Sequence, residues 1–443
     1  MSRIERLGRQ IELSYSTNVH PAESLDDQLR MLGAQVAPVM SQALGAQPWY
    51  AVNLRVGQRQ ADEILCHGPL PSDSALSDAV LAAPPSENCH KLLSTLAAHK
   101  LRVASINGFP ILDFHAPRVK EQVYSPPWTD GGRALYTLKI AKVFSHLMSD
   151  RSTAAVSVPT GTFKGYSDGE EIRMQCAHFI TECAKELLRL ERLTGKTVKL
   201  GLEPEPYTTA ESMDEFCAYF KHCILLQARS KWPLQLGIST QKAEELARKF
   251  ITVNLDLCHA AVEFEDPIED LKRLRAEGIS VTGIHVSAAL KLPEPAKNKA
   301  ALDALLALNE PRYLHQVVGR LRTGLLAHFE DLPDLERLRT RPRGAQLADF
   351  DEIRCHFHVP LFAEWPGPLA STRDSAAPAA RFAVKEGITD NLIVETYTWD
   401  VLSSLASKGV DAAKGMLGSG RVDVTEGLVK ELKWVLETLS SES

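Results

Sequence analysis

The chain has 443 residues, a length that one large α/β barrel with insertions can accommodate. Hydrophobic residues make up 44% and charged residues 24% of the sequence, which excludes a mostly disordered chain and allows a sizeable core. The 50 Lys and Arg residues against 56 Asp and Glu give a formal net charge of −6, which argues against general binding to nucleic acid.

The composition and the apolar pattern also indicate the cellular compartment in which the protein is expected. No apolar run approaches the roughly 20 residues that a membrane span needs, and the first residues lack the apolar core of a secretory signal. The eight cysteines include no C-x-x-C pair, and we interpret them as reduced thiols. We therefore expect a cytoplasmic protein without a membrane span.

Short β-rich segments alternate with stretches of helical periodicity along the chain. The segments are ELSYSTNV near residue 12, YAVNLRVG at 50, VASINGF at 103, TAAVSVPTG at 153, TVKLGLEPEP at 197, FITVNLDLCH at 250, SVTGIHVSA at 280 and NLIVETYTW at 391. Such alternation requires parallel strands with right-handed crossovers, and eight repeats favour a closed barrel over an open Rossmann-like sheet. We predict an α/β fold, a single (β/α)8 TIM-barrel domain over residues 1–443.

Two of the intervening helices have clear sequence signals. One is expected after Ser24, with an apolar face formed by Leu25, Leu29, Leu32, Val36 and Val39. Another is expected from about Glu170 to Leu193, ended by Gly195.

The segment CHFHVPLF at residue 355 also resembles a strand and would be a ninth. The preceding stretch is rich in Pro, Leu and Arg and has short helical pieces. We therefore predict an insertion over residues 288–354, after the seventh strand, that covers the barrel mouth and returns through His356 and His358.

Polar residues end four consecutive predicted strands: Glu203, Asp256, His285 and Glu395, with His259 three residues beyond Asp256. The C-terminal ends of barrel strands converge on one pocket, so these side chains are expected to lie together. A mixed oxygen and nitrogen site suits a divalent ion such as Mn, Zn, Fe, Co or Mg. An unpaired Asp256 in an apolar strand would cost several kcal/mol, so a metal ion or an Arg is expected beside it.

His356 and His358 flank Phe357, so on a strand both imidazoles would lie on one face and could bind a second metal ion. The alternative is a surface strand with two solvated imidazoles. Four further residues are expected at the substrate. They are Glu205, either as a general base or as a plain loop carboxylate, His20 and His115 at the pocket rim, and Trp399 as a substrate contact.

The order Glu, Asp-x-x-His, His, Glu on strands five to eight resembles the metal constellation of the xylose-isomerase-like TIM-barrel superfamily. That superfamily includes sugar isomerases, ketose 3-epimerases, inosose dehydratases and endonuclease IV-type enzymes. The H-x-H at His356 and His358 resembles the second paired-ligand motif of its multi-metal members. The segments LSYSTNVHP, CHFHVPLF and IVETYTW are similar to the EboE type of metabolite-traffic protein, found in gene clusters for prenylated or aromatic secondary metabolites.

The sequence departs from two branches of this superfamily. Aldose isomerases usually carry a Lys just beyond the strand-five glutamate, where this chain has Glu205, so hydride-shift isomerisation is disfavoured. Endonuclease members have further histidines on strands two and three, where this chain has Asn53, Arg55 and Asn107.

The resemblance implies a metal-dependent isomerase or epimerase that moves a proton on a sugar- or cyclitol-like metabolite, with Glu203 and Glu395 as the acid/base pair. Two alternatives stay open: a barrel that binds and hands on a metabolite unchanged, and a metal-dependent phosphoesterase of the endonuclease IV type. Other proteins of a metabolite-traffic cluster are expected partners. The sequence leaves the substrate, the metal and the oligomeric state open.

Overall fold

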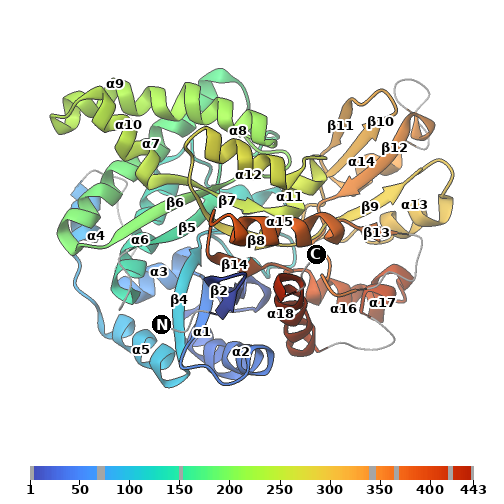
Figure 1. The fold of residues 1–443 in the computed structure, drawn as a ribbon, viewed down its shortest axis with the longest axis horizontal. Coiled ribbons are helices and arrows are strands. Elements are labelled where there is room, and N and C mark those ends of the chain that lie inside the picture. The colour runs from blue at the N-terminus through green and yellow to red at the C-terminus, as the bar shows by residue number, and fades with distance from the viewer. Residues whose placement is uncertain are drawn as a thin grey trace.

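A computed structural model describes residues 4–66, 75–148, 153–338, 346–363, 369–417 and 423–440. Eight parallel strands form the barrel (Figure 1). They are β2 (Arg9–Tyr15), β3 (Tyr50–Arg55), β4 (Leu101–Asn107), β5 (Thr153–Pro159), β6 (Thr197–Glu203), β7 (Ile251–Asp256), β8 (Val281–Val286) and β14 (Asn391–Val394).

The strand order shows how the barrel closes. The order is β2-β14-β8-β7-β6-β5-β4-β3, and a parallel bridge between Ser16 and Asn53 joins the two outermost barrel strands. A short strand, β1 (Ile4–Arg6), pairs antiparallel with β2. Each barrel strand coincides with a predicted segment, and the predicted barrel is confirmed.

Helices connect the barrel strands and pack around them. They are α1 (Leu25–Met31), α2 (Ala37–Leu44), α3 (Gln58–Leu65), α4 (Ala75–Ala82), α5 (Glu87–Ala98), α6 (Gly131–Leu147), α7 (Glu170–Thr194), α8 (Met213–Tyr219), α9 (Leu225–Leu236), α10 (Thr240–Phe250), α11 (Leu257–Val262), α12 (Pro267–Ala276), α15 (Arg373–Lys385), α16 (Trp399–Ser407), α17 (Asp411–Leu417) and α18 (Val424–Ser440). Both helices singled out in the sequence are present: Ser24 caps α1 with a capping box, and Gly195 ends α7 at a φ of 71°.

A second, antiparallel sheet lies between β8 and β14 in the chain and beside the barrel in space (Figure 1). Its strands are β9 (Leu290–Pro293), β10 (Val317–Leu321), β11 (Leu326–Phe329), β12 (Phe350–Cys355) and β13 (Ala370–Ser371), in the order β11-β10-β12-β9-β13. The helices α13 (Lys299–Leu306) and α14 (Leu332–Arg337) accompany it.

The strand expected at CHFHVPLF is wrong in its extent. β12 ends at Cys355, and the amide of Phe357 donates to the carbonyl of Cys355 at 2.8 Å, which turns the chain out of the sheet. His356 and His358 therefore lie in the loop after β12, not on a strand.

Strand β7 shows how the barrel positions polar groups inside. All six residues of β7 are buried, and Ile251, Val253 and Leu255 belong to the apolar core. The alternate residues Asn254 and Asp256 share the other face, because successive side chains of a strand point to opposite sides. Asp256 is the last of this polar row and emerges at the carboxyl end of the barrel.

Candidate metal centre

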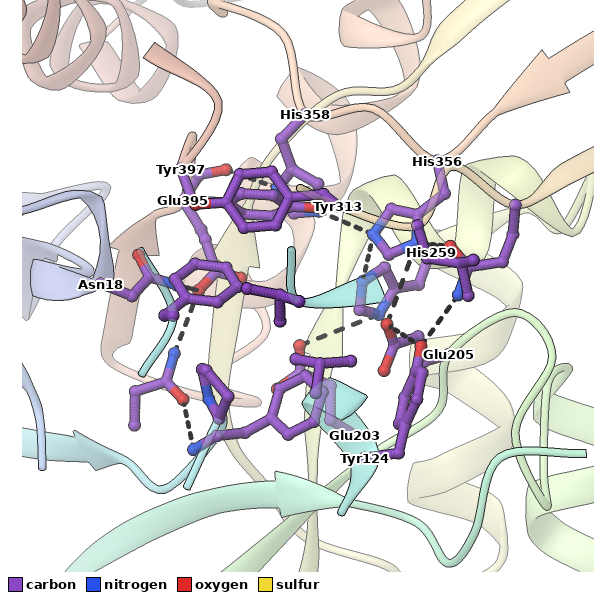
Figure 2. A pocket seen from close by; sticks show the side chains of 18 of the residues that line it. Asn18, Tyr124, Glu203, Glu205, His259, Tyr313, His356, His358, Glu395 and Tyr397 are labelled. Atoms are coloured by element: carbon purple, nitrogen blue, oxygen red, sulfur yellow. Dashed lines mark hydrogen bonds and ion pairs between the residues drawn. The ribbon is translucent and has the colours of Figure 1, made fainter. Parts of the chain in front are cut away.

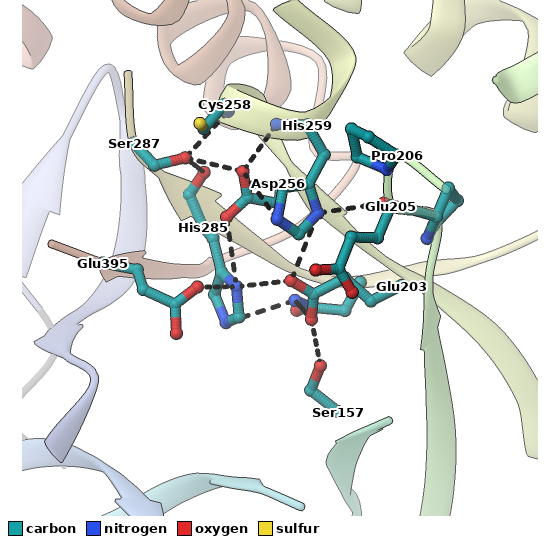
Figure 3. A network of polar contacts seen from close by, with 12 residues as sticks. Ser157, Glu203, Glu205, Pro206, Asp256, Cys258, His259, His285, Ser287 and Glu395 are labelled. Carbon is teal, nitrogen blue, oxygen red and sulfur yellow. Dashed lines mark hydrogen bonds and ion pairs between the residues drawn. The ribbon is translucent and has the colours of Figure 1, made fainter. Parts of the chain in front are cut away.

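Glu203, Asp256, His285 and Glu395 meet at the carboxyl ends of neighbouring barrel strands (Figure 3). Each offers one ligand atom, and these atoms lie within 4.8 Å of one another. The Nδ1 atom of His285 lies 3.1 Å from Glu203 Oε1, 3.5 Å from Asp256 Oδ2 and 2.9 Å from Glu395 Oε2. The four strand-end residues named from the sequence thus form one compact cluster.

The electrostatics of this cluster leave negative charge uncompensated. Burial opposes the charged imidazole of His285, but the carboxylates of Glu203 and Glu395 raise its pKa well above the ordinary value. Burial likewise opposes the charged carboxylate of Asp256, but neighbouring histidines hold its pKa well below the ordinary value. Three carboxylates around one imidazole keep an excess of negative charge even when the imidazole is protonated.

Asp256 tests whether the cluster fits a cation. Its Oδ1 atom accepts the backbone amide of His259 at 2.9 Å and the hydroxyl of Ser287 at 2.8 Å. Its Oδ2 atom is buried and has no hydrogen-bond partner. In the part of the chain that the structure describes, His259 and His285 lie within ion-pair distance of Asp256, and the Arg partner weighed as an alternative is not seen. A buried, unpartnered carboxylate oxygen fits a metal ligand.

Three further histidines, His259, His356 and His358, bring their Nε2 atoms together above this cluster (Figure 2). The Nε2 atom of His356 lies 3.1 Å from that of His259 and 3.2 Å from that of His358. Each ring uses its Nδ1 atom elsewhere. The Nδ1 acceptors are the carbonyl of Pro204 at 3.0 Å for His259, Gln316 Oε1 at 2.8 Å for His356 and the carbonyl of Glu395 at 2.7 Å for His358.

These Nδ1 partners fix the tautomer that each ring has in its neutral form. A carbonyl oxygen only accepts, so each Nδ1 atom carries the proton and each Nε2 atom keeps its lone pair. The amide of Gln316 is oriented by its Nε2 atom, which donates to the Pro206 carbonyl at 3.2 Å. Three converging lone pairs repel one another unless a proton or a metal ion lies between them.

Carboxylates and a thiol next to these histidines complete further ligand sets. The sets of buried residues are Asp256, His259 and His358; Glu205, His259 and His356; and Cys258, His356 and His358. The residues predicted as metal ligands therefore lie together, in adjoining sets whose residue types fit divalent ions.

Glu205 lies at the edge of the histidine group and is held by a tyrosine. Tyr124 donates to Glu205 Oε1 at 2.7 Å, and Gln316 Nε2 donates to the Tyr124 hydroxyl at 2.8 Å. Burial raises the pKa of Glu205 to about 7, although His259 acts in the opposite direction. A carboxyl group with this pKa can give or take a proton near neutral pH.

A pocket of about 550 Å³, its opening included, is lined by Glu203 and Glu395 of the first cluster and by the three histidines, which together form its floor (Figure 2). Apolar side chains line the other walls, among them Phe109, Phe114 and Val123 from the segment after β4. Tyr313 and Gln316 come from the segment between α13 and β10. The chain between β8 and β14 thus contributes both ligand-type residues and a wall of the pocket.

The remaining predicted substrate contacts do not line this pocket. His20 is buried with its Nε2 atom 2.9 Å from the Tyr15 hydroxyl, and burial lowers its pKa to about 3. His115 is not part of the pocket lining, and its Nε2 atom lies 2.9 Å from the carbonyl of Asn18. Trp399 faces away: its ring packs on α18 at Gly427, and its Nε1 atom donates to Glu431 at 3.3 Å.

Several pocket residues were not identified from the sequence as site residues. Asn18 and Asn107 donate to Glu395 Oε1 at 2.9 and 3.1 Å and fix the direction of that carboxylate. Asn107 ends β4, so the strand-end rule that identified the candidate ligands also applied to it. Tyr124 and Gln316 come from segments outside the barrel strands, so the strand-end rule does not identify them.

A substitution of Gln316 tests the orientation of the histidines. In Gln316→Leu, the Nδ1 proton of His356 loses its acceptor, so we expect metal affinity to fall roughly 10–100-fold. Gln316→Glu restores an acceptor and should retain most of the affinity. Competition with a chromophoric chelator measures both constants, and equal affinity of the Leu variant and wild type would contradict this role.

The buried carboxyl of Glu431 gives a prediction about pH. Burial raises its pKa to about 7 from an ordinary value of 4.5, so the folded protein retains a proton that the unfolded chain releases. The free energy of unfolding should therefore fall as pH rises from 4.5 to 7, by about 3 kcal/mol in total. Glu431→Gln removes this loss and should gain that much stability relative to wild type between pH 4.5 and 8. Urea unfolding at pH 4.5 and at pH 8 checks this prediction. The exposed Glu437→Gln is the control, and its stability relative to wild type should be the same at both pH values.

Comparisons with known proteins add the following. No family model and no curated protein matches the sequence. Similar solved structures include L-ribulose 3-epimerase, with 11% identity over 97% of this chain and 94% of that chain and a TM-score of 0.44. They also include the IolI protein with a bound zinc atom, at 10% identity over 97% and 98% with a TM-score of 0.41, and 3-keto-D-glucoside 4-epimerase YcjR from E. coli, at 11% over 62% and 79% with 0.32.

The barrel assignment stands on the strand pairing of this chain itself. Among the described residues, no helix is long and apolar enough to cross a membrane. The fold and the site together define a TIM-barrel protein whose pocket floor carries carboxylate and imidazole ligands that fit divalent metal ions.

Proposed function

We propose that this chain is a divalent-metal enzyme that isomerises or epimerises a small sugar- or cyclitol-like metabolite by proton transfer. The observation that carries the proposal is the placement of Glu203 and Glu395 on either side of His285 at the pocket floor (Figure 3). Two carboxylates so placed can take a proton from one side of a substrate carbon and return it to the other.

A divalent ion held by Glu203, Asp256, His285 and Glu395 would draw electron density from adjacent substrate oxygens and make the neighbouring C–H more acidic. The Asn18 and Asn107 amides hold Glu395 Oε1, which leaves Oε2 directed at the cluster. The hydroxyl of Ser157 and the amide of Asn254 hold Glu203 Oε2 in the same way. Both carboxylates are thus oriented by the protein before a substrate arrives.

Aromatic side chains form part of the pocket wall, which suits a reaction from which water must be excluded. Phe114, Tyr313 and Tyr397 contact one another with ring centroids 4.7–5.3 Å apart, and Tyr397 also packs on His358 at 4.7 Å. These rings keep solvent from the carboxylates, which strengthens their interaction with a charged intermediate.

The proposal includes the metabolite-traffic role that the EboE resemblance implies. Its three motifs supply residues of this pocket: Asn18 from the first, His356 and His358 from the second, and Glu395 and Tyr397 from the third. This agreement supports a common site for the motifs, with a small-molecule metabolite as its ligand.

Proton exchange with solvent tests the proposal directly. Wild-type protein loaded with Mn²⁺ or Zn²⁺ is incubated in deuterated water with a panel of ketoses and cyclitols, and proton NMR follows loss of the signal at the exchanging carbon. We expect exchange with at least one compound that binds. Binding without exchange for every bound compound would overturn the enzyme and favour a carrier.

The histidine group supports a second candidate, metal-assisted hydrolysis of a phosphoester. Adjoining ion positions at His259, His356 and His358 resemble the arrangement that two-metal hydrolysis requires. Release of phosphate or nitrophenol from simple phosphate mono- and diesters, with no deuterium exchange into sugars, would favour it. The net charge of −6 disfavours duplex DNA as the substrate, and incision of an abasic-site duplex would contradict that expectation.

A further inference from the structure

A separate cluster of ligand-type side chains lies outside the pocket, where the second sheet meets the barrel. Glu211 precedes α8, Glu263 directly follows α11, and His328 lies on β11. Each offers one ligand atom within 4.8 Å of the other two. Two of these residues belong to the barrel connections and one to the second sheet, and Figure 1 shows α11 next to that sheet.

Glu263 has the unsatisfied atom of this cluster. Its side chain is 2% exposed, and its Oε2 atom lies 2.8 Å from His328 Nε2. Its Oε1 atom is buried and has no hydrogen-bond partner. Leaving a buried carboxylate oxygen unpartnered costs free energy, so this atom indicates a missing ligand.

The charges around Glu263 call for a cation. Glu211 is 9% exposed and contacts Lys164, whose Nζ atom also lies 3.8 Å from Glu215. When Glu211, Glu215 and Glu263 are all ionised, they carry three negative charges, of which Lys164 neutralises one. With His328 neutral, two negative charges remain, and one divalent ion would balance them.

We propose that Glu211, Glu263 and His328 bind one divalent transition-metal ion, most suitably Zn²⁺, with water as a further ligand. Two carboxylates and one imidazole are ligands that zinc accepts, and the 30% exposure of His328 leaves room for water and for entry of the ion. The site is distinct from the pocket and does not depend on the proposed reaction.

The position of this ion gives it a structural role. The helix α11 begins after Asp256, carries His259 and ends next to Glu263, so the two metal sites lie at opposite ends of one short helix. The ion would tie β11 to that helix. Strand β11 pairs with β10, which follows Gln316, and β10 pairs with β12, which leads to His356. Holding β11 therefore holds a wall of the pocket.

Zinc counting on the full chain tests the site. Wild type, His328→Ala and Glu263→Gln are saturated with Zn²⁺, desalted and subjected to elemental analysis, with the exposed His222→Ala as the matched histidine control. We expect each of the two cluster variants to hold one zinc ion fewer than wild type and His222→Ala to hold the same number. Equal zinc in all four proteins would overturn the proposal and leave a His328–Glu263 ion pair.

A second measurement separates this site from the pocket and from effects on folding. In a chain carrying Asp256→Asn and His259→Ala, Zn²⁺ should still raise the melting temperature, and adding His328→Gln should make that rise smaller. Persistence of the full rise in the triple variant would contradict the site. Absence of deuterium exchange, which would overturn the proposed enzyme, leaves both zinc measurements unchanged.

Discussion

Glu395→Gln should lower the rate of solvent-deuterium exchange into a bound ketose or cyclitol by a factor on the order of 10²–10⁴. The substitution keeps the size of the side chain and one oxygen, but it removes the group that accepts the proton. Because Asn18 and Asn107 donate to Oε1, the amide oxygen should take that place and direct the amide nitrogen at the cluster. The rate is measured by NMR at saturating metal and ligand, so that weaker metal binding does not enter the comparison.

A matched carboxylate in the same pocket serves as the control. Glu205 lies outside the four-ligand cluster, so Glu205→Gln should reduce exchange less than Glu395→Gln. If Glu205→Gln abolished exchange while Glu395→Gln retained it, the proton acceptor would be the Tyr124-bound carboxyl of Glu205. A carrier protein would show no exchange in any of the variants.

Trp399→Ala should lower the free energy of unfolding by about 3–5 kcal/mol, the usual cost of truncating a buried tryptophan. The indole is fully buried, stacks on Phe362 and donates to Glu431. A Cβ added at Gly427 would lie 2.4 Å from the ring, so α16 and α18 are in close contact through it. Truncation therefore leaves a cavity that the helices cannot fill without moving.

Urea unfolding measures the cost, with the half-buried Trp49→Ala as a control of smaller effect. Trp399→Phe retains most of the ring and should lose less than the Ala variant. Because Trp399 lies outside the pocket lining, the folded variant should bind ligand as wild type does. If Trp399→Ala folds stably but has lost ligand binding, Trp399 contacts the substrate, as expected from the sequence.

The barrel strands could be predicted because they are short apolar runs and all but β8 are followed by a helix. The second sheet could not. Its strands β10, β11 and β12 are short, and β9 pairs with β12 across more than fifty residues of chain. Such pairing is decided by tertiary contacts, since a strand of four residues has too few positions to show a period of two.

The clustering of Glu203, Asp256, His285 and Glu395 could be predicted for a reason that does not extend to the residues that hydrogen-bond to this site. Glu203, Asp256 and His285 end barrel strands, and strand ends converge whatever the loops do. Tyr124 and Gln316 reach the pocket only because two separate segments fold over it. Trp399 was expected to contact the substrate, but the chain enters α16 at that residue and the indole packs on α18.

The metal content of the purified protein shows whether the pocket floor binds a divalent ion. Protein purified without chelators is subjected to elemental analysis beside a variant carrying Asp256→Asn and His285→Ala, and both are melted with and without chelator. We predict at least one divalent ion per wild-type chain, fewer in the variant, and a lower melting temperature of wild type after chelation. Wild-type protein that holds no divalent ion, takes up none on addition and melts unchanged after chelation would contradict the account.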